Sequence, residues 1–274
     1  MDAEAWFLDT AIAAGLYGLL VGMFVPALIA RIPEPEQGVP GDEIDAELPH
    51  KVRGDPAAAT VEPNAVVPEA AAAIPTPDAP EPKERYDAIA GTRGLRWKTS
   101  LATGVVAALI GARLGWEPEL SFLLYLAPVG VALAVIDWRT RLLPTKLVAP
   151  TYLAVIVLAV VSAWAAQDWS HLATAGWGWL VAGGTFFVLW FIYPRGMGYG
   201  DVRLAGVLGI ALGYLGWSEM LTGVYTGFLL GGVGGLLLAT LRIVDRKAYP
   251  FGPFMLVGAL VGILTGPTVA LWYF

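Results

Sequence analysis

Long apolar runs alternate with short polar or charged segments along the 274 residues of the chain. A helix needs roughly 20 mostly apolar residues to cross a bilayer. Only 15% of the residues are charged, against about a quarter in soluble domains. The pattern therefore predicts an all-α, polytopic transmembrane helix bundle of about eight spans, at residues 6–30, 98–116, 119–137, 147–166, 173–193, 202–217, 219–241 and 251–273.

The distribution of positive charge predicts the orientation of these spans. Lys and Arg gather in alternate connecting segments, at 31–97, 138–146, 194–201 and 242–250, and only Arg113 clearly belongs to the opposite side. Cytoplasmic loops are enriched in Lys and Arg, so we expect the N-terminus outside, in a multi-pass protein of the cell (cytoplasmic) membrane. The chain opens with Met1-Asp2-Ala3-Glu4 instead of positive charge, which is unlike a cleavable signal peptide.

Residues 34–94 differ in composition from the rest of the chain. They hold 13 acidic residues, 5 basic residues and ten prolines, and such a segment buries too little apolar surface to offset the entropy of ordering. We expect a disordered acidic cytoplasmic linker, most simply a solvated spacer, with a docking role as the alternative. The predicted domains are the first transmembrane helix (1–33), this linker (34–94) and a seven-helix domain (95–274).

The composition excludes several kinds of site. The chain has no cysteine, so it has no thiolate nucleophile and no Cys-ligated zinc site. His50 and His171 stand alone in loops, without a second ligand at helical spacing. Glycines that recur every four residues, such as Gly227 and Gly231, are typical of close helix packing in membranes rather than of a phosphate loop. We expect neither a metal nor a nucleic-acid partner.

Acidic residues at the cytoplasmic ends of the predicted spans are the candidates for chemistry, because ionisable groups in membrane helices are costly. Asp245 lies among basic neighbours and is most simply a solvated ion pair. Taken alone, Asp137 is explained by an ion pair with Arg139 or Arg141 as well as by a catalytic role. Taken alone, Asp201 is explained equally well as a helix N-cap. Together they lie at the same predicted membrane depth, where two carboxylates that share a proton can activate water.

Two segments carry a resemblance to the prepilin peptidase (type IV leader peptidase) family. Residues 198–201 (GYGD), followed by Val-Arg-Leu, resemble its GxGD signature, whose core also occurs in presenilin-like intramembrane proteases. Residues 137–144 (DWRTRLLP) resemble the segment around the first catalytic aspartate of the family. The resemblance implies an aspartic endopeptidase with Asp137 and Asp201 as the catalytic pair, and it requires no cofactor for peptide cleavage.

Two further segments match the family less directly. Residues 250–254 (PFGPF) resemble its third signature, and residues 22–33 (GMFVPALIARIP) are a degenerate copy of its N-terminal pattern. The resemblance therefore implies active-site support from these glycines and prolines, and a methylation-related role for Gly22 and Arg31. The supporting residues are Gly198, Gly200, Pro250, Gly252 and Pro253.

Many members of the family also methylate the new N-terminus from S-adenosylmethionine and carry paired CxxC motifs in the first cytoplasmic loop. Here the cysteines are absent and the acidic linker replaces that loop, so the methyltransferase step stays open. The resemblance implies a prepilin or pseudopilin substrate that is cut at the cytoplasmic face of the bilayer. The alternatives are a proton-coupled carrier, which would show repeats with broken helices, and an inactive secretion-assembly scaffold.

Overall fold

The computed structural model describes residues 6–34, 84–194, 197–241 and 250–273, and every regular element among them is a helix. The side chains of 235, 236, 238, 239 and 270–273 are outside this description. The elements are α1 (Leu8–Gly22), α2 (Val25–Ala30), α3 (Tyr86–Ala90), α4 (Leu95–Leu114), α5 (Leu120–Thr140), α6 (Thr145–Ala166), α7 (Ser170–Gly178), a π-helical turn (Trp179–Gly183), α8 (Gly184–Ile192), α9 (Tyr199–Leu215), α10 (Trp217–Thr240) and α11 (Gly252–Tyr273).

The prediction of an all-helical membrane protein is confirmed, and each of the eight apolar runs overlaps a helix. Four stretches are long and apolar enough to cross a bilayer: Leu120–Thr140, Thr145–Ala166, Ser170–Ile192 and Gly252–Val269. The third of these contains α7, the π-helical turn and α8 in direct succession. The total of eight spans and their orientation remain predictions.

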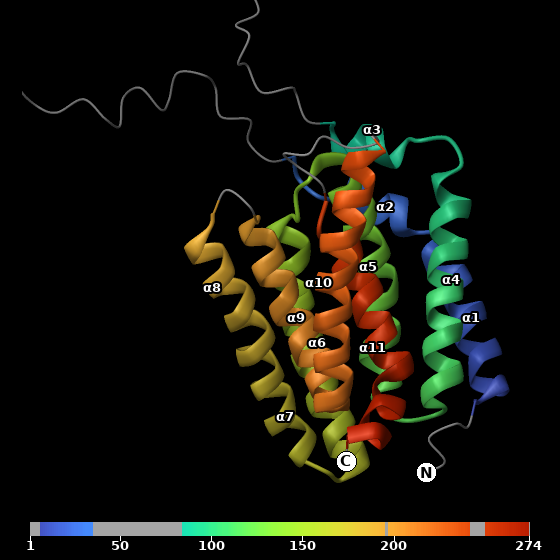
Figure 1. Ribbon diagram of the computed structural model, residues 1–274. Helices are drawn as coiled ribbons and strands as arrows, with labels where there is room; N and C mark the ends of the chain where they lie inside the picture. The colour runs from blue at the N-terminus through green and yellow to red at the C-terminus, as the bar shows by residue number, and fades with distance from the viewer. Residues whose placement is uncertain (1–5, 35–83, 195–196, 242–249, 274) are drawn as a thin grey trace, which may run out of the picture. The chain divides into compact units, whose positions relative to one another are not determined.

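The first predicted run, 6–30, is not one continuous helix. It breaks after Gly22, and α2 begins at Val25 with Pro26 in its first turn. Proline supplies no backbone N–H and disfavours helical geometry in the residue before it, so it ends one helix and starts the next. The short α2 lies against α3 and α5 at one end of the bundle (Figure 1).

The predicted linker is too long at its C-terminal end. Tyr86–Ala90 is helical, and Tyr86 and Ile89 are 3% and 0% exposed. Residues three apart share one face of a helix, so these two large side chains can pack together into the core formed with Val25 and Ile29 of α2. The rest of the predicted linker, residues 35–83, and Asp245 lie outside the described residues.

Glycine sets the distance between the most closely paired helices. α1 packs along α4, α7 along α9, and α10 along α11 (Figure 1). At Gly18 in α1, a Cβ atom would lie 2.6 Å from the carbonyl oxygen of Thr103, and in α10 and α11 a Cβ at Gly258 would meet the backbone of Gly227. Small residues allow this close approach of two backbones, as the glycine repeats predict.

One end of the bundle carries the predicted site. The C-terminal end of α5, the N-terminal end of α9 and the N-terminal end of α11 lie at the end that also carries α2 and α3, opposite the described ends of the chain (Figure 1). Large buried side chains below this end, among them Ile136, Leu133 and Leu204, join α5 and α9 to one apolar core. The packing therefore fixes the positions of the helix ends on which the candidate aspartates stand.

Candidate active site

Asp137 lies in the last turn of α5 and is buried, with 4% of its surface exposed. Its Oδ2 atom accepts a hydrogen bond of 2.9 Å from the backbone N–H of Gly252, the first residue of α11. A buried carboxylate requires such donors, because leaving a buried charge without partners is expensive. The contact joins residues 115 positions apart and brings the PFGPF segment onto the carboxylate.

The ion-pair interpretation of Asp137 does not fit the geometry. Arg139 instead holds Glu84, through Nε at 2.7 Å and Nη2 at 2.6 Å. Arg141 ends α5 with φ of 55°, in the left-handed region that helix ends often use, and its N–H donates to the carbonyl of Asp137 at 2.8 Å. α5 thus continues through Thr140 and ends at Arg141, while the carboxylate of Asp137 faces the start of α11.

Asp201 lies in the first turn of α9 and is 8% exposed. Its Oδ2 atom accepts the N–H of Gly198 at 3.1 Å, while its own N–H donates to the carbonyl of Gly198 at 3.0 Å. This is the arrangement by which an acidic residue in the first turn reaches back to the residue before the helix. The N-cap interpretation of Asp201 is therefore corrected: Gly198 is the N-cap residue of α9, and Asp201 binds it from the third helical position. This contact coexists with a place in the candidate site.

The two aspartates lie at the same end of the bundle, Asp137 in the last turn of α5 and Asp201 in the first turn of α9, and both carboxylates are buried. Like charges at close range in a buried site favour a state in which one carboxylate keeps its proton. Such a pair offers a proton acceptor and a proton donor side by side, which suits the activation of water against a carbonyl group. Among the described residues, no group of three or more His, Cys, Asp or Glu side chains could hold a metal.

The supporting glycines have different surroundings. A Cβ atom at Gly252 would lie 2.8 Å from Oδ2 of Asp137, whereas one at Gly198 would lie 3.4 Å from Oδ2 of Asp201, which is ordinary contact. At Gly200 a Cβ atom would lie 2.8 Å from Cβ of Leu143. The space beside Gly200 is thus occupied by Leu143 of the protein itself.

An apolar cavity of about 210 Å³ lies below the aspartates, between α4, α5, α9 and α11. Gly130 and Ala134 line it from α5, seven and three positions before Asp137, and Leu208 lines it from α9, seven positions after Asp201. Because residues three, four and seven apart share a helix face, the cavity continues along the faces that carry the two carboxylates. Pro253, next to Gly252, also lines it, while Pro250 is buried at the start of this segment.

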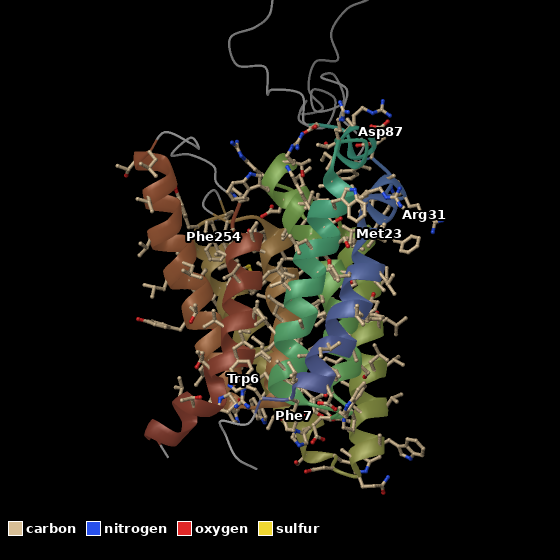
Figure 2. The ribbon with its side chains drawn as sticks, turned by 90° about the vertical axis from the view of Figure 1, so that its right-hand side faces the viewer. Trp6, Phe7, Met23, Arg31, Asp87 and Phe254 are labelled. Carbon is tan, nitrogen blue, oxygen red and sulfur yellow. The ribbon has the colours of Figure 1, made fainter. Side chains whose placement is uncertain are left out.

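The N-terminal motif stands apart from the aspartate pair. A Cβ atom at Gly22 would lie 2.7 Å from both Cα of Ser100 and the carbonyl oxygen of Thr99, and the Thr99 hydroxyl donates to the carbonyl of Gly22 at 2.9 Å. Arg31 is exposed at the α2 end of the bundle (Figure 2). Gly22 is thus a packing position between α1 and α4, and the structure does not bring the two residues together around a cavity.

Apolar membrane-length helices with two buried carboxylates at one end define a helical membrane protein with a candidate site at that end. The sequence pattern of the type IV leader peptidase family matches residues 124–240, which include Asp137 and Asp201. A prepilin leader peptidase/N-methyltransferase of Escherichia coli (strain K12) is 31% identical over 166 residues, covering 58% of this chain and 70% of the relative. The chain therefore belongs to the type IV leader peptidase family.

Two further relatives have the same name. The Aeromonas salmonicida protein is 29% identical over 185 residues, which cover 64% of this chain. The Pseudomonas aeruginosa protein is 26% identical over 271 residues, which cover 94% of this chain and 91% of the relative. The chain spans 58% of the length of the Aeromonas relative. No solved structure matches this chain.

Proposed function

We propose that the protein is an intramembrane aspartic endopeptidase that removes the leader peptide of type IV prepilins or pseudopilins. The observation that carries the proposal is the burial of the Asp137 and Asp201 carboxylates at the same end of the bundle, each held by a backbone N–H. Membership of the type IV leader peptidase family supports the reaction class, and relatives named prepilin leader peptidase support the substrate class.

The aspartate pair supplies both halves of an acid–base mechanism. The ionised carboxylate takes a proton from a water molecule as the water oxygen bonds to the scissile carbonyl carbon. The protonated carboxylate donates its proton to the carbonyl oxygen, which gives a neutral tetrahedral diol. As the diol collapses and the C–N bond breaks, the protonated carboxylate donates its proton to the leaving amine, and the ionised carboxylate accepts the proton of one diol hydroxyl. The products are a carboxylic acid and an amine, and the pair again holds one proton. The N–H of Gly252 and that of Gly198 hold the two carboxylates in place during these transfers.

The membrane face of this reaction follows from the proposed topology. With eight spans and the N-terminus outside, the end that carries α2, α3 and the two aspartates is cytoplasmic, because alternate connections rich in Lys and Arg are at this end. A leader that stays in the cytoplasm would then meet the site directly. The seven-helix part, 95–274, holds the site, and the acidic segment after the first helix belongs to the same face.

We place the apolar part of the substrate in the cavity below the pair. A chain that is cut at the end of a membrane helix must continue beside helices whose surface is apolar. The cavity starts at Ala134, one turn from Asp137, and is lined almost entirely by apolar atoms. Apolar side chains that follow the scissile bond would fill it while the peptide bond lies between the carboxylates.

The relatives' names include an N-methyltransferase activity, but the surroundings of Gly22 and Arg31 do not support this activity in this chain. The packing of Gly22 against Thr99 and Ser100 leaves no space there for S-adenosylmethionine, and Arg31 is exposed. These two residues therefore do not form a cofactor site, and we derive no step through them. Mass spectrometry of the cleaved product detects the additional methyl group if another part of the chain performs this step.

Cleavage of a co-expressed prepilin tests the proposal, with the product N-terminus identified by mass spectrometry. The proposal is supported if the prepilin loses its leader when the wild-type protein is present and keeps it when the Asp137→Asn variant is present. If the protein is inserted in the membrane and the wild type leaves a panel of prepilins and pseudopilins uncut, the proposal is contradicted and the scaffold alternative gains. Proton-coupled transport that depends on the aspartates would instead support the carrier alternative.

A further inference from the structure

Glu34 and Glu84, the described residues on either side of the segment 35–83, form contacts at the same end of the bundle. Oε1 of Glu34 accepts the backbone N–H of Tyr86 at 2.6 Å. Glu84, two residues before Tyr86, binds Arg139 through both carboxylate oxygens, at 2.6 and 2.7 Å. The chain that leaves α2 and the chain that enters α3 are therefore joined to each other and to the end of α5. We call these two contacts, Glu34–Tyr86 and Glu84–Arg139, the clamp.

An apolar base supports the clamp. Tyr86 and Ile89 of α3 belong to the same buried core as Val25 and Ile29 of α2, and all four side chains are at most 3% exposed. α2 and α3 pack against each other and against α5. The end of the bundle with α2 and α3 includes the positions marked by Arg31 and Asp87 in Figure 2. The clamp thus stands on a buried apolar base, although the side chains of Glu84 and Arg139 are themselves partly exposed.

We propose that Glu84 is a positioning residue for Asp137, and that the clamp allows the segment between its two acidic ends to be removed without loss of peptidase activity. This inference rests on the proposed function. Arg139 follows Asp137 by two residues in the last turn of α5, and the last turn of a helix lacks part of its hydrogen bonding and frays unless other groups hold it.

Contacts hold the last turn of α5 through two of its residues. Gly252 donates to the side chain of Asp137, and Glu84 binds the guanidinium of Arg139 in the two-bond geometry that fixes the orientation of both groups. The pair also keeps Arg139 engaged with Glu84, so that this cation does not neutralise the aspartate pair. Because the pair is partly exposed, at 39% and 34% of the side chains, its loss changes the geometry of the site rather than the fold.

The matched variants are Glu84→Gln and Asp87→Asn. Glu84→Gln keeps the size of the side chain and removes the charge that holds Arg139. Asp87 also forms an ion pair, with Arg85 at 3.1 Å. This pair lies on the surface at the start of α3, where the side chains of Arg85 and Asp87 are 67% and 59% exposed. Both variants lose one surface carboxylate, and only the first loses a contact with α5.

The measurement is kcat and KM for prepilin cleavage by the full-length protein in membranes. We expect Glu84→Gln to lower kcat by roughly three- to fivefold, the size expected for one partly exposed charge pair, with KM unchanged. Asp87→Asn should retain the wild-type kcat. Arg139→Gln should lower kcat similarly, and the double variant Glu84→Gln/Arg139→Gln should be no slower than the slower single variant, because both remove one contact. Wild-type kcat in Glu84→Gln, or equal losses in Glu84→Gln and Asp87→Asn, overturns the positioning role.

Two deletions test the second half of the inference. One replaces 36–82 by a short Gly-Ser linker and keeps the clamp, since the atoms at its ends are already in contact. The other replaces 36–90 and removes Glu84, Tyr86 and Ile89 with it. We expect the first to cleave with the wild-type kcat and KM, and the second to lose kcat by at least as much as Glu84→Gln.

The result can be separated from a failure of the proposed function. If the wild type cuts no prepilin, the proposed function fails, and with it the claim that Glu84 positions Asp137 for cleavage. If the wild type cuts and the 36–82 deletion raises KM in a salt-dependent manner, the acidic segment attracts the substrate by charge and the claim that it is dispensable is wrong. Thermal melting of each purified variant in detergent shows whether it is folded, and Glu84→Gln keeps the test decisive if a deletion does not fold.

Discussion

The two candidate catalytic aspartates are held in different ways. Asp201 stands at the start of a helix and binds the N–H of Gly198, three residues earlier in the same signature. Asp137 stands at the end of a helix and binds the N–H of Gly252, 115 residues later. One carboxylate is therefore placed by its own sequence neighbourhood, and the other by the packing of α5 against α11. Changes near Asp201 should act locally, whereas changes that shift α11 should act on Asp137.

The largest expected effect comes from the carboxylates themselves. Asp137→Asn and Asp201→Asn should each lower prepilin cleavage by roughly 10²- to 10⁴-fold, the usual contribution of a positioned acid or base. Quantitative separation of precursor and product, with membrane insertion of each variant verified, measures the loss. A variant that keeps more than a tenth of the wild-type rate would contradict a catalytic role for that residue.

The next largest effect should come from the remote partner of Asp137. Gly252→Ala would place a Cβ atom 2.8 Å from Oδ2 of Asp137, so the carboxylate or the start of α11 must move. We expect kcat to fall by roughly 10- to 100-fold, because small displacements of a catalytic group are costly. Single-turnover cleavage rates would measure this, and a wild-type rate would show that the contact with Gly252 does not set the position of the carboxylate.

A smaller effect is expected in the cavity that lies below both aspartates. Ala134→Phe fills it from α5, and the existing space of about 210 Å³ lets the ring enter without disrupting the core. Cleavage should fall by about tenfold, since a hydrophobic subsite contributes on this scale, with a rise in KM. Val157→Phe on the exposed face of α6, where Val157 is 50% exposed, is the control. Equal rates for the two variants would remove the cavity from the substrate path.

The smallest effect is expected beside Asp201. Gly198 has φ of −72° and ψ of 143°, a geometry that alanine adopts, and a Cβ atom there meets Oδ2 of Asp201 at an ordinary 3.4 Å. The N–H that binds the carboxylate is retained in Gly198→Ala. Its cleavage rate should stay within about twofold of the wild type, since no unfavourable contact is introduced. A loss as large as that of Gly252→Ala would show that both aspartates are equally sensitive to their surroundings.

The helical membrane class could be predicted from the sequence because hydropathy is a local property. The runs that predict spans coincide with helices, including Leu120–Thr140 and Thr145–Ala166. The break between α1 and α2 was missed because Val25–Ala30 is apolar on both sides of Pro26, although this proline was the available signal. The helix Tyr86–Ala90 was missed because proline and acidic residues dominate the composition around its two buried side chains.

The site was predictable to the extent that it is local. The GYGD segment identifies Asp201, and its own Gly198 supplies the partner. The partner of Asp137, the pair between Glu84 and Arg139, and the cavity all join segments far apart in the chain. The PFGPF motif predicts Gly252 as a supporting residue, but no short window shows which group it contacts, because these contacts depend on which helix ends the packing of the bundle brings together.

The central claim is that Asp137 and Asp201 act as one unit, and the double variant Asp137→Asn/Asp201→Asn tests it most directly. Groups that act in the same step give strongly non-additive losses. We therefore predict that prepilin cleavage by the inserted double variant is no slower than cleavage by the slower single variant. A loss in the double variant equal to the product of the two single losses would show that the aspartates act independently, and would contradict the shared site.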